Sequence, residues 1–181
     1  MIVDAIREAV LGHFPPALPL TVLATQPAFY LRAAATRTGL TVVALDRDVR
    51  AIAPLADENI LFDGLGDVDE PVAVLRALRA TSPHARLFAL IPNGAYGPTI
   101  ARFAAGENVY RSHPLVDAEI AELIAAGGWS TIARVPIFDG SPVPATFPAV
   151  AGAGGVTLTV DSAEVSQRLR AAGFLVTAQP A

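Results

Sequence analysis

The residues best suited to chemistry are polar side chains that follow short apolar runs, where a buried strand would end. Thr25 and Gln26 follow "LTVLA", Asp46 closes "LTVVALD", and Asn93 follows "RLFALIP", with Tyr96 close behind. A carboxylate in such a place can accept hydrogen bonds from ribose hydroxyls. An amide and a phenol can each donate and accept hydrogen bonds to a polar substrate. These residue types indicate a small-molecule site at the edge of a sheet.

Two of these positions have an equally good structural explanation. Pro92-Asn93-Gly94 is a composition that favours a tight turn in any surroundings. Asp46 opens the charged stretch "DRDVR", which suits a solvated surface loop. The residues alone leave both alternatives open.

The elements that must position these residues alternate between strand-like and helix-like patterns. Strands are expected at 20–25, 40–46, 59–64, 86–91, 129–138, 156–160 and 174–179. Helices are expected at 2–11, 28–39, 69–83, 97–106, 117–128 and 162–173, with a helical turn or two at 47–55. Asp69 is the predicted N-cap of the helix at 69–83. Apolar strands between helices predict an α/β fold, a Rossmann-like three-layer sandwich with a mainly parallel central sheet and an antiparallel strand near the C-terminus.

The 181 residues are expected to form a single domain. Residues 1–19 are interpreted as an N-terminal helix with a Pro-rich connector, and 139–155 as a Pro/Gly-rich loop. The chain is 52% hydrophobic and 17% charged, which argues against disorder. No apolar run reaches the roughly 18 residues of a membrane span, and no secretory signal is recognised, so a cytoplasmic location is expected.

Composition also excludes several kinds of chemistry. The absence of cysteine excludes disulfides, thiolate zinc sites and a cysteine nucleophile, and the absence of lysine excludes a Schiff base. The histidines lie in separate connectors without the spacing of metal ligands, so no metal is expected. A net charge of −4 without a basic cluster argues against nucleic-acid binding.

The segment at 60–97, "ILFDGLGDVDEPVAVLRALRATSPHARLFALIPNGAYG", resembles the central part of class I S-adenosylmethionine-dependent methyltransferases, most of all small bacterial members. The family has a Leu-Glu-His-Val-x-Asp-Pro element, of which this chain keeps Leu65, Val68, Glu70 and Pro71. Ile91-Pro92-Asn93 stands as the family has it. "VVALD" at 42–46 and the segment at 116–136 are similar to the family's second strand and its later helix-to-strand unit.

The resemblance implies S-adenosylmethionine as the cofactor and assigns a role to each candidate residue. Thr25 and Gln26 would line the methionine side, Asp46 would hold the ribose, and Leu65 would face the adenine. Asn93 and Tyr96 would face the methyl acceptor. No catalytic residue and no metal ligand is assigned.

The chain departs from the family in the half that binds the cofactor. The turn from Thr25 to Ala35 contains no glycine, although the cofactor of these enzymes lies against bare backbone there. Gly66-Asp67 replaces the family's Glu-His pair. Too few residues separate Asp46 from the next strand for the usual helix and strand, which leaves Asp57 as the candidate for the adenine-contacting acid.

These departures favour a degenerate relative that has lost S-adenosylmethionine binding and acts as a binding, assembly or regulatory protein. The alternative is an active S-adenosylmethionine-dependent methyltransferase of reduced size that acts on a small molecule or a sugar. The expected partner is a protein in the first case and a small-molecule acceptor in the second. Either function is compatible with a homodimer of this chain.

Overall fold

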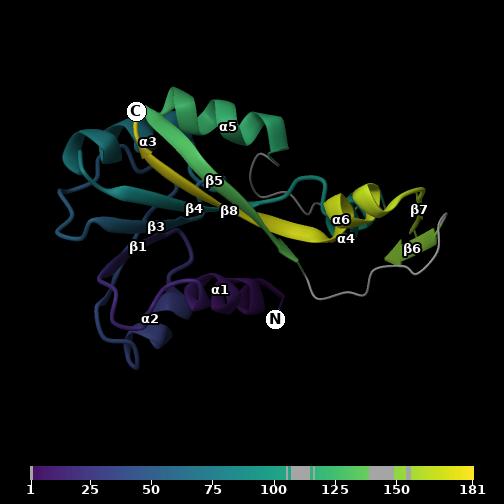
Figure 1. The fold of residues 1–181 in the computed structure, drawn as a ribbon, viewed down its shortest axis with the longest axis horizontal. Helices are drawn as coiled ribbons and strands as arrows, with labels where there is room; N and C mark the ends of the chain where they lie inside the picture. Colours follow the sequence, from purple (N-terminus) through teal and green to yellow (C-terminus); the bar gives the residue numbers. More distant parts are fainter. Residues whose placement is uncertain (1, 105, 107–114, 116, 139–148, 154–155) are drawn as a thin grey trace.

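The computed structural model describes residues 2–104, 106, 115, 117–138, 149–153 and 156–181. The elements in chain order are α1 (Ile2–Gly12), β1 (Leu20–Ala24), α2 (Ala28–Ala34), β2 (Leu40–Ala44), β3 (Asn59–Asp63), α3 (Pro71–Thr81), β4 (Arg86–Pro92), α4 (Gly97–Ala104), α5 (Asp117–Ala126), β5 (Trp129–Phe138), β6 (Ala149–Ala153), β7 (Val156–Val160), α6 (Ala163–Arg170) and β8 (Ala171–Pro180). These elements form a layered α/β structure (Figure 1).

The main sheet has the strand order β2-β1-β3-β4-β8-β5. β1 pairs in parallel with β2 and β3, and β3 pairs in parallel with β4. β8 runs antiparallel to both of its neighbours, β4 and β5. The predicted fold, a mainly parallel sheet with an antiparallel strand near the C-terminus, is therefore confirmed.

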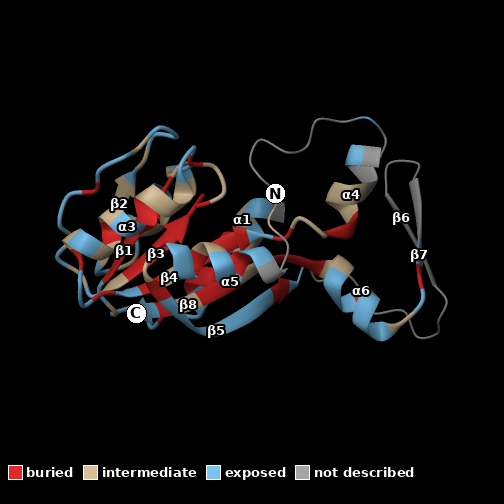
Figure 2. Ribbon diagram, turned by 90° about the horizontal axis from the view of Figure 1, so that it is seen from above, coloured by how far each residue is buried: buried red, intermediate tan, exposed pale blue. Residues whose placement is uncertain are grey.

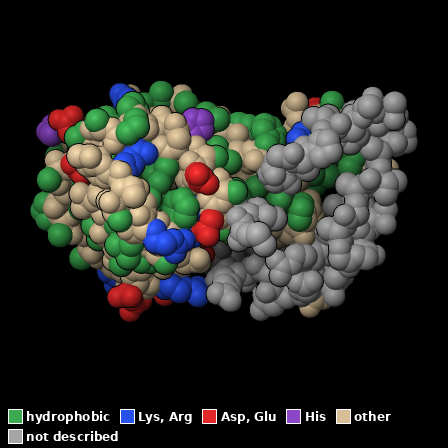
Figure 3. Space-filling model, turned by 90° about the horizontal axis from the view of Figure 1, so that it is seen from below, with side chains coloured by type: hydrophobic (Ala, Val, Ile, Leu, Met, Phe, Trp, Pro, Cys, Tyr) green, Lys and Arg blue, Asp and Glu red, His purple; other side chains and the backbone are tan. Residues whose placement is uncertain are grey.

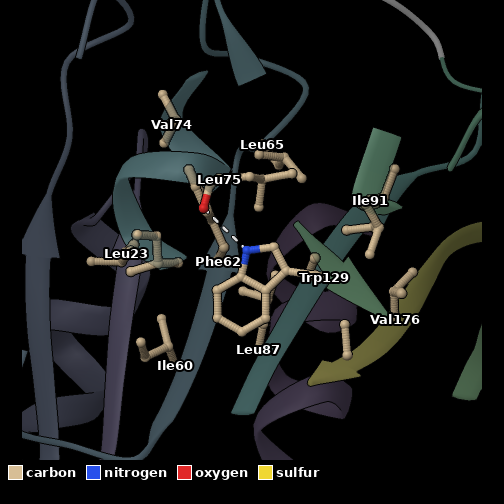
Figure 4. Packing of buried hydrophobic residues seen from close by; sticks show 14 of the residues in the cluster. Leu23, Ile60, Phe62, Leu65, Val74, Leu75, Leu87, Ile91, Trp129 and Val176 are labelled. Atoms are coloured by element: carbon tan, nitrogen blue, oxygen red, sulfur yellow. Dashed lines mark hydrogen bonds between the residues drawn. The ribbon is translucent and has the colours of Figure 1, made fainter. Parts of the chain in front are cut away.

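Helices cover both faces of this sheet. α1 and α2 lie on one face, and α3 and α5 lie on the other (Figure 1). β1 and β3 are almost wholly buried, whereas β2 at one edge is only partly buried and β5 at the other edge is exposed along most of its length (Figure 2). On the face of α3 and α5, the side chain of Trp129 is enclosed by apolar residues, and its Nε1–H donates to the carbonyl of Leu75 over 3.1 Å (Figure 4).

A smaller group of elements lies beyond the carboxyl end of β4. α4 packs against the antiparallel pair of β6 and β7 and against α6, and α6 leads directly into β8 (Figure 1).

The molecular surface on the underside of the view in Figure 1 carries basic and acidic side chains scattered among apolar ones (Figure 3). In the described part of the chain, no helix is long and apolar enough to cross a membrane.

Several local predictions are wrong. Residues 47–55 form no helix, because Ile52 and its apolar neighbours instead pack irregularly onto the core under α3. The predicted loop at 139–155 contains strand β6, while 139–148 and 154–155 lie outside the described residues. Asp69 does not cap α3: the N-cap is Glu70, which makes no capping side-chain bond, and Asp69 forms an ion pair with Arg47.

Some predicted boundaries also shift. α2 ends at Ala34 rather than near Gly39, and Gly39 instead makes a turn at φ +79° that leads into β2. β8 begins at Ala171, so it takes up residues predicted to end the preceding helix.

Candidate functional site

The strand order of the main sheet reverses between β1 and β3, which makes this point a topological switch point. From β1 the chain proceeds to β2 on one side, and the following strands β3 and β4 lie on the other side. Ligands of open α/β sheets bind in the crevice outside the carboxyl ends of the strands at such a switch point. The carboxyl ends that meet here are those of β1, followed by Thr25, and β3, followed by Gly64.

Thr25 fills the space between these two strand ends. Its Oγ1 donates to Oδ2 of Asp67 over 3.0 Å, and its backbone N–H donates to the carbonyl of Asp63 over 3.3 Å. Gly64 has φ +103°, and a Cβ atom at this position would lie 2.1 Å from Oγ1 of Thr25. The chain thus needs a glycine after β3, where it makes room for the side chain that follows β1.

The loops after β2 and β3 join across the end of β1, the strand between them. Arg47 donates from Nε to the carbonyl of Asp67 over 3.0 Å, and its own carbonyl accepts from the N–H of Asp69 over 2.8 Å. Arg50 and Glu70 extend this bridge with an ion pair of 3.4 Å. These contacts link the two loops that flank the switch point.

A buried polar cluster lies beside the switch point, on the face covered by α1 and α2. Arg7 of α1 donates from Nε to Oδ2 of Asp63 over 2.6 Å, and its guanidinium lies 5.8 Å from the ring centre of Tyr30. The three residues are 8%, 7% and 0% exposed, respectively. Asp63 therefore ties α1 to the carboxyl end of β3.

Burial shifts the pKa values of this cluster. It raises the pKa of the Asp63 carboxyl, against the opposing effect of the Arg7 guanidinium. Burial also raises the pKa of the Tyr30 phenol, and the nearby Asp63 carboxylate adds to that rise. The Tyr30 hydroxyl lies beside the Asp63 carboxylate and the Arg7 guanidinium, but it makes no hydrogen bond of good geometry with a described residue.

This cluster was not predicted from the sequence. The available signal was a charged residue, Asp63, at the end of an otherwise apolar strand. A second signal was a basic residue, Arg7, three positions before the buried Val10 on the same helix.

The other residues predicted to bind a cofactor differ in their accessibility. Gln26 and Asp46 are exposed, and their side chains make no hydrogen bond or ion pair with any described residue. Leu65 is fully buried in the core under α3 and α5. Asp57 accepts a hydrogen bond of 2.6 Å from Oγ1 of Thr21, near the start of β1, so it lies away from the carboxyl ends of the strands.

Asn93 follows β4 at the carboxyl edge, as predicted, but its side chain is 6% exposed and binds within the chain. Its Nδ2 donates to the carbonyls of Arg168 and Ala171 over 3.0 and 2.8 Å. Its Oδ1 accepts from the N–H of Ala95 over 3.0 Å. The amide thereby holds the end of β4 against the junction of α6 and β8.

Tyr96 lies one turn beyond Asn93 and is 8% exposed. Its backbone N–H donates to the carbonyl of Asn93 over 3.1 Å. The structure thus brings Asn93 and Tyr96 together at the end of β4, whereas Thr25 lies at the end of β1, with β3 between the two strands. Among the described residues, no group of His, Asp and Glu is arranged to hold a metal ion.

Comparison with known proteins defines the class of fold. No protein-family profile and no curated protein sequence matches this chain. Solved structures do match it, and several of them are methyltransferases by name. The chain therefore has a methyltransferase-like Rossmann fold.

Individual solved structures align along nearly the whole chain. A chain from a complex containing the Haloferax volcanii Trm112 methyltransferase activator aligns with 97% of this chain and 88% of its own, at a TM-score of 0.60 and 16% identity. An S-adenosylmethionine-dependent methyltransferase from Mesorhizobium loti aligns over 98% and 99%, at a TM-score of 0.58 and 14% identity. The mitomycin 7-O-methyltransferase MmcR has a TM-score of 0.58 and 13% identity, and the match spans 54% of its length.

Proposed function

We propose that this chain is a methyltransferase-fold protein that has lost S-adenosylmethionine binding at the switch point. It works as a binding, assembly or regulatory protein. The contact between Thr25 and Gly64, fastened by the hydrogen bond from Thr25 to Asp67, carries this proposal.

A cofactor at the switch point needs space next to bare backbone, and here a side chain takes that space. To admit a ligand between β1 and β3, the Thr25 side chain would have to leave Gly64 and give up its bond to Asp67. The bridge through Arg47 would also have to open, because it crosses the end of β1. The residues present do not fit the cofactor in this position.

A protein partner is supported by one of the structural comparisons. A chain of similar fold comes from a complex that contains the Trm112 methyltransferase activator. A methyltransferase-like fold can therefore be part of a protein assembly, although fold likeness alone does not fix function.

The second candidate is an active methyltransferase of reduced size that acts on a small molecule or a sugar. The exposed carboxylate of Asp46, which bonds to no described residue, favours it, because an acid at the end of the second strand can accept hydrogen bonds from ribose hydroxyls. Gln26 is exposed at the same edge. In this candidate Thr25 would line the methionine side and Asn93 and Tyr96 the acceptor side.

This second candidate requires rearrangement of three of its residues. Leu65, which would face the adenine, is fully buried, and Asn93 would exchange its bonds to the α6–β8 junction for bonds to a substrate. Thr25 would have to leave Gly64.

Titration calorimetry with S-adenosylmethionine and S-adenosylhomocysteine distinguishes the two candidates. We expect no heat of binding and no rise in melting temperature at ligand concentrations on the order of millimolar. A ligand present at about 100 times its Kd would stabilise the fold by about 2.7 kcal/mol, so specific binding would be visible.

The matched variants are Asp46→Ala and Asp48→Ala, since both carboxylates are exposed in the same loop. Saturable binding that Asp46→Ala abolishes and Asp48→Ala preserves would overturn the proposal in favour of the active enzyme.

A further inference from the structure

The two edge strands of the main sheet differ in how they are protected. β5 has a break in register between Thr131 and Ala133, a charged side chain at Arg134 and a proline at Pro136. Bulges, charges and proline are the features that keep an exposed edge from pairing with another strand. β2 (Leu40–Ala44) has none of them: its sequence is LTVVA, and it pairs with β1 in unbroken register.

The outer edge of β2 presents backbone groups that bond to no other described residue. The carbonyl of Gly39 accepts from the N–H of Leu20, and the N–H of Leu45 donates to the carbonyl of Ala24. The backbone groups of Gly39 and Leu45 therefore point toward β1. Because successive residues of a strand point their N–H and C=O groups to opposite sides, those of Leu40, Val42 and Ala44 point outward. Among the described residues no other strand pairs with β2 on that side.

The sequence of β2 is complementary to itself. A two-fold axis through Val42 would place Val42 opposite its own copy, and Leu40 opposite Ala44 of the second copy, with the outward groups of each forming reciprocal hydrogen bonds. Thr41 would then stand opposite Val43 of the second copy. All of these facing side chains are uncharged, and most are β-branched, which favours cross-strand packing.

We propose that β2 pairs antiparallel with β2 of a second copy of this chain, so that two sheets join into one across a two-fold axis. The same operation on β5 is disfavoured, because Pro136 has no N–H to donate and the bulge interrupts the strand. This proposal does not depend on whether S-adenosylmethionine binds, because the outer edge of β2 is formed by the strand's own backbone.

Analytical ultracentrifugation of the whole chain over a concentration series tests the proposal. We expect a monomer–dimer equilibrium that Ala44→Pro weakens at least tenfold and Ala44→Ser leaves unchanged. Ala44 is exposed and its N–H points outward, so the proline removes an intermolecular donor from each copy and leaves the pairing with β1 in place. A parent chain that is monomeric throughout, or a dimer that Ala44→Pro does not weaken, would overturn the proposal.

Spin labelling gives a second test that needs no destabilising variant. The chain has no cysteine, so Thr41→Cys on β2 and the control Ser130→Cys on β5 each accept a single label at an exposed position. In the proposed dimer the two β2 positions lie within about 10 Å of each other, and dipolar broadening is expected in the electron paramagnetic resonance spectrum. Broadening at Ser130→Cys and not at Thr41→Cys would place the contact at β5 and refute the proposal.

Discussion

The two faces of the main sheet are stabilised in different ways. The core cluster under α3 and α5 consists of apolar side chains, and the one polar side-chain atom of Trp129 donates a hydrogen bond to the carbonyl of Leu75. The face under α1 and α2 holds the buried cluster of Arg7, Tyr30 and Asp63 among its apolar residues. The stability of the apolar face depends on close packing of its side chains, whereas the stability of the other face depends on keeping a buried charge paired.

The position of the polar cluster shows what the difference means for the site. Asp63 is the last residue of β3, and its carbonyl accepts from the N–H of Thr25, which closes the switch point. The face that carries buried charge is therefore directly connected to the candidate site. A buried ion pair is weak evidence for stability, so we regard a specifying role for Arg7 and Asp63 as a hypothesis to be tested.

The largest effect is expected from Trp129→Ala, which removes the largest side chain of the apolar face. The side chain is 1% exposed, so its removal leaves a cavity and should lower the free energy of unfolding by about 4 kcal/mol. Urea denaturation measures this loss. Trp129→Phe should lose less, because it keeps most of the volume, and equal losses for the two variants would contradict a packing role.

Asp63→Ala tests the polar face and should destabilise the fold by about 3 kcal/mol. The variant leaves the buried Arg7 guanidinium with only the half-exposed carboxylate of Asp4, 3.7 Å away, a situation more costly than the loss of the contact itself. The double variant Arg7→Met with Asp63→Leu removes both charges and should recover most of the lost stability in urea denaturation. A double variant as unstable as Asp63→Ala would show that the pair does more than balance its own charges.

Asn93→Ala extends the comparison to the carboxyl end of β4 and should cost about 2 kcal/mol. The change removes the donors to Arg168 and Ala171 and leaves their carbonyls without this partner. Hydrogen exchange should accelerate in α6 and at the start of β8, and stay unchanged in β1 and β2. Asn93→Asp should be at least as unstable, because it brings carboxylate oxygens against those carbonyls. Unchanged exchange in both variants would mean that the amide is free for a ligand.

The fold could be predicted from the sequence because its signals are local. Apolar runs ending in Gly, Pro or Asp gave the strands of the main sheet, and helical periodicity gave the helices between them. The irregular path of 47–55 was mistaken for helix because Ile52 and its apolar neighbours allow either structure. Residues 149–153 were mistaken for loop because their small side chains carry little strand signal.

The contacts at the candidate site could not be predicted, because they join distant parts of the chain. Arg7 and Asp63 are 56 residues apart, and Thr25 and Asp67 are 42 apart, so no local pattern links them. For Asn93 the sequence indicates a turn after a central strand. It gives no sign that the carbonyls at 168 and 171 take up the amide.

The smallest predicted effect is on pH dependence and concerns Tyr30. Its pKa is raised in the folded state by burial and by the Asp63 carboxylate, whereas in the unfolded chain it is about 10. The neutral phenol therefore contributes stability that is fully present below about pH 10 and is lost as the pH rises through the folded-state value. Above about pH 10 the free energy of unfolding should fall more steeply in the parent than in Tyr30→Phe, by at most about 1.4 kcal/mol per pH unit.

Urea denaturation between about pH 8 and 11 measures the two slopes. Tyr96→Phe is the matched control, because it removes a buried phenol hydroxyl at the end of β4, outside the cluster of Arg7, Tyr30 and Asp63. Parallel slopes for parent and Tyr30→Phe would show that the cluster opens to water in alkaline solution.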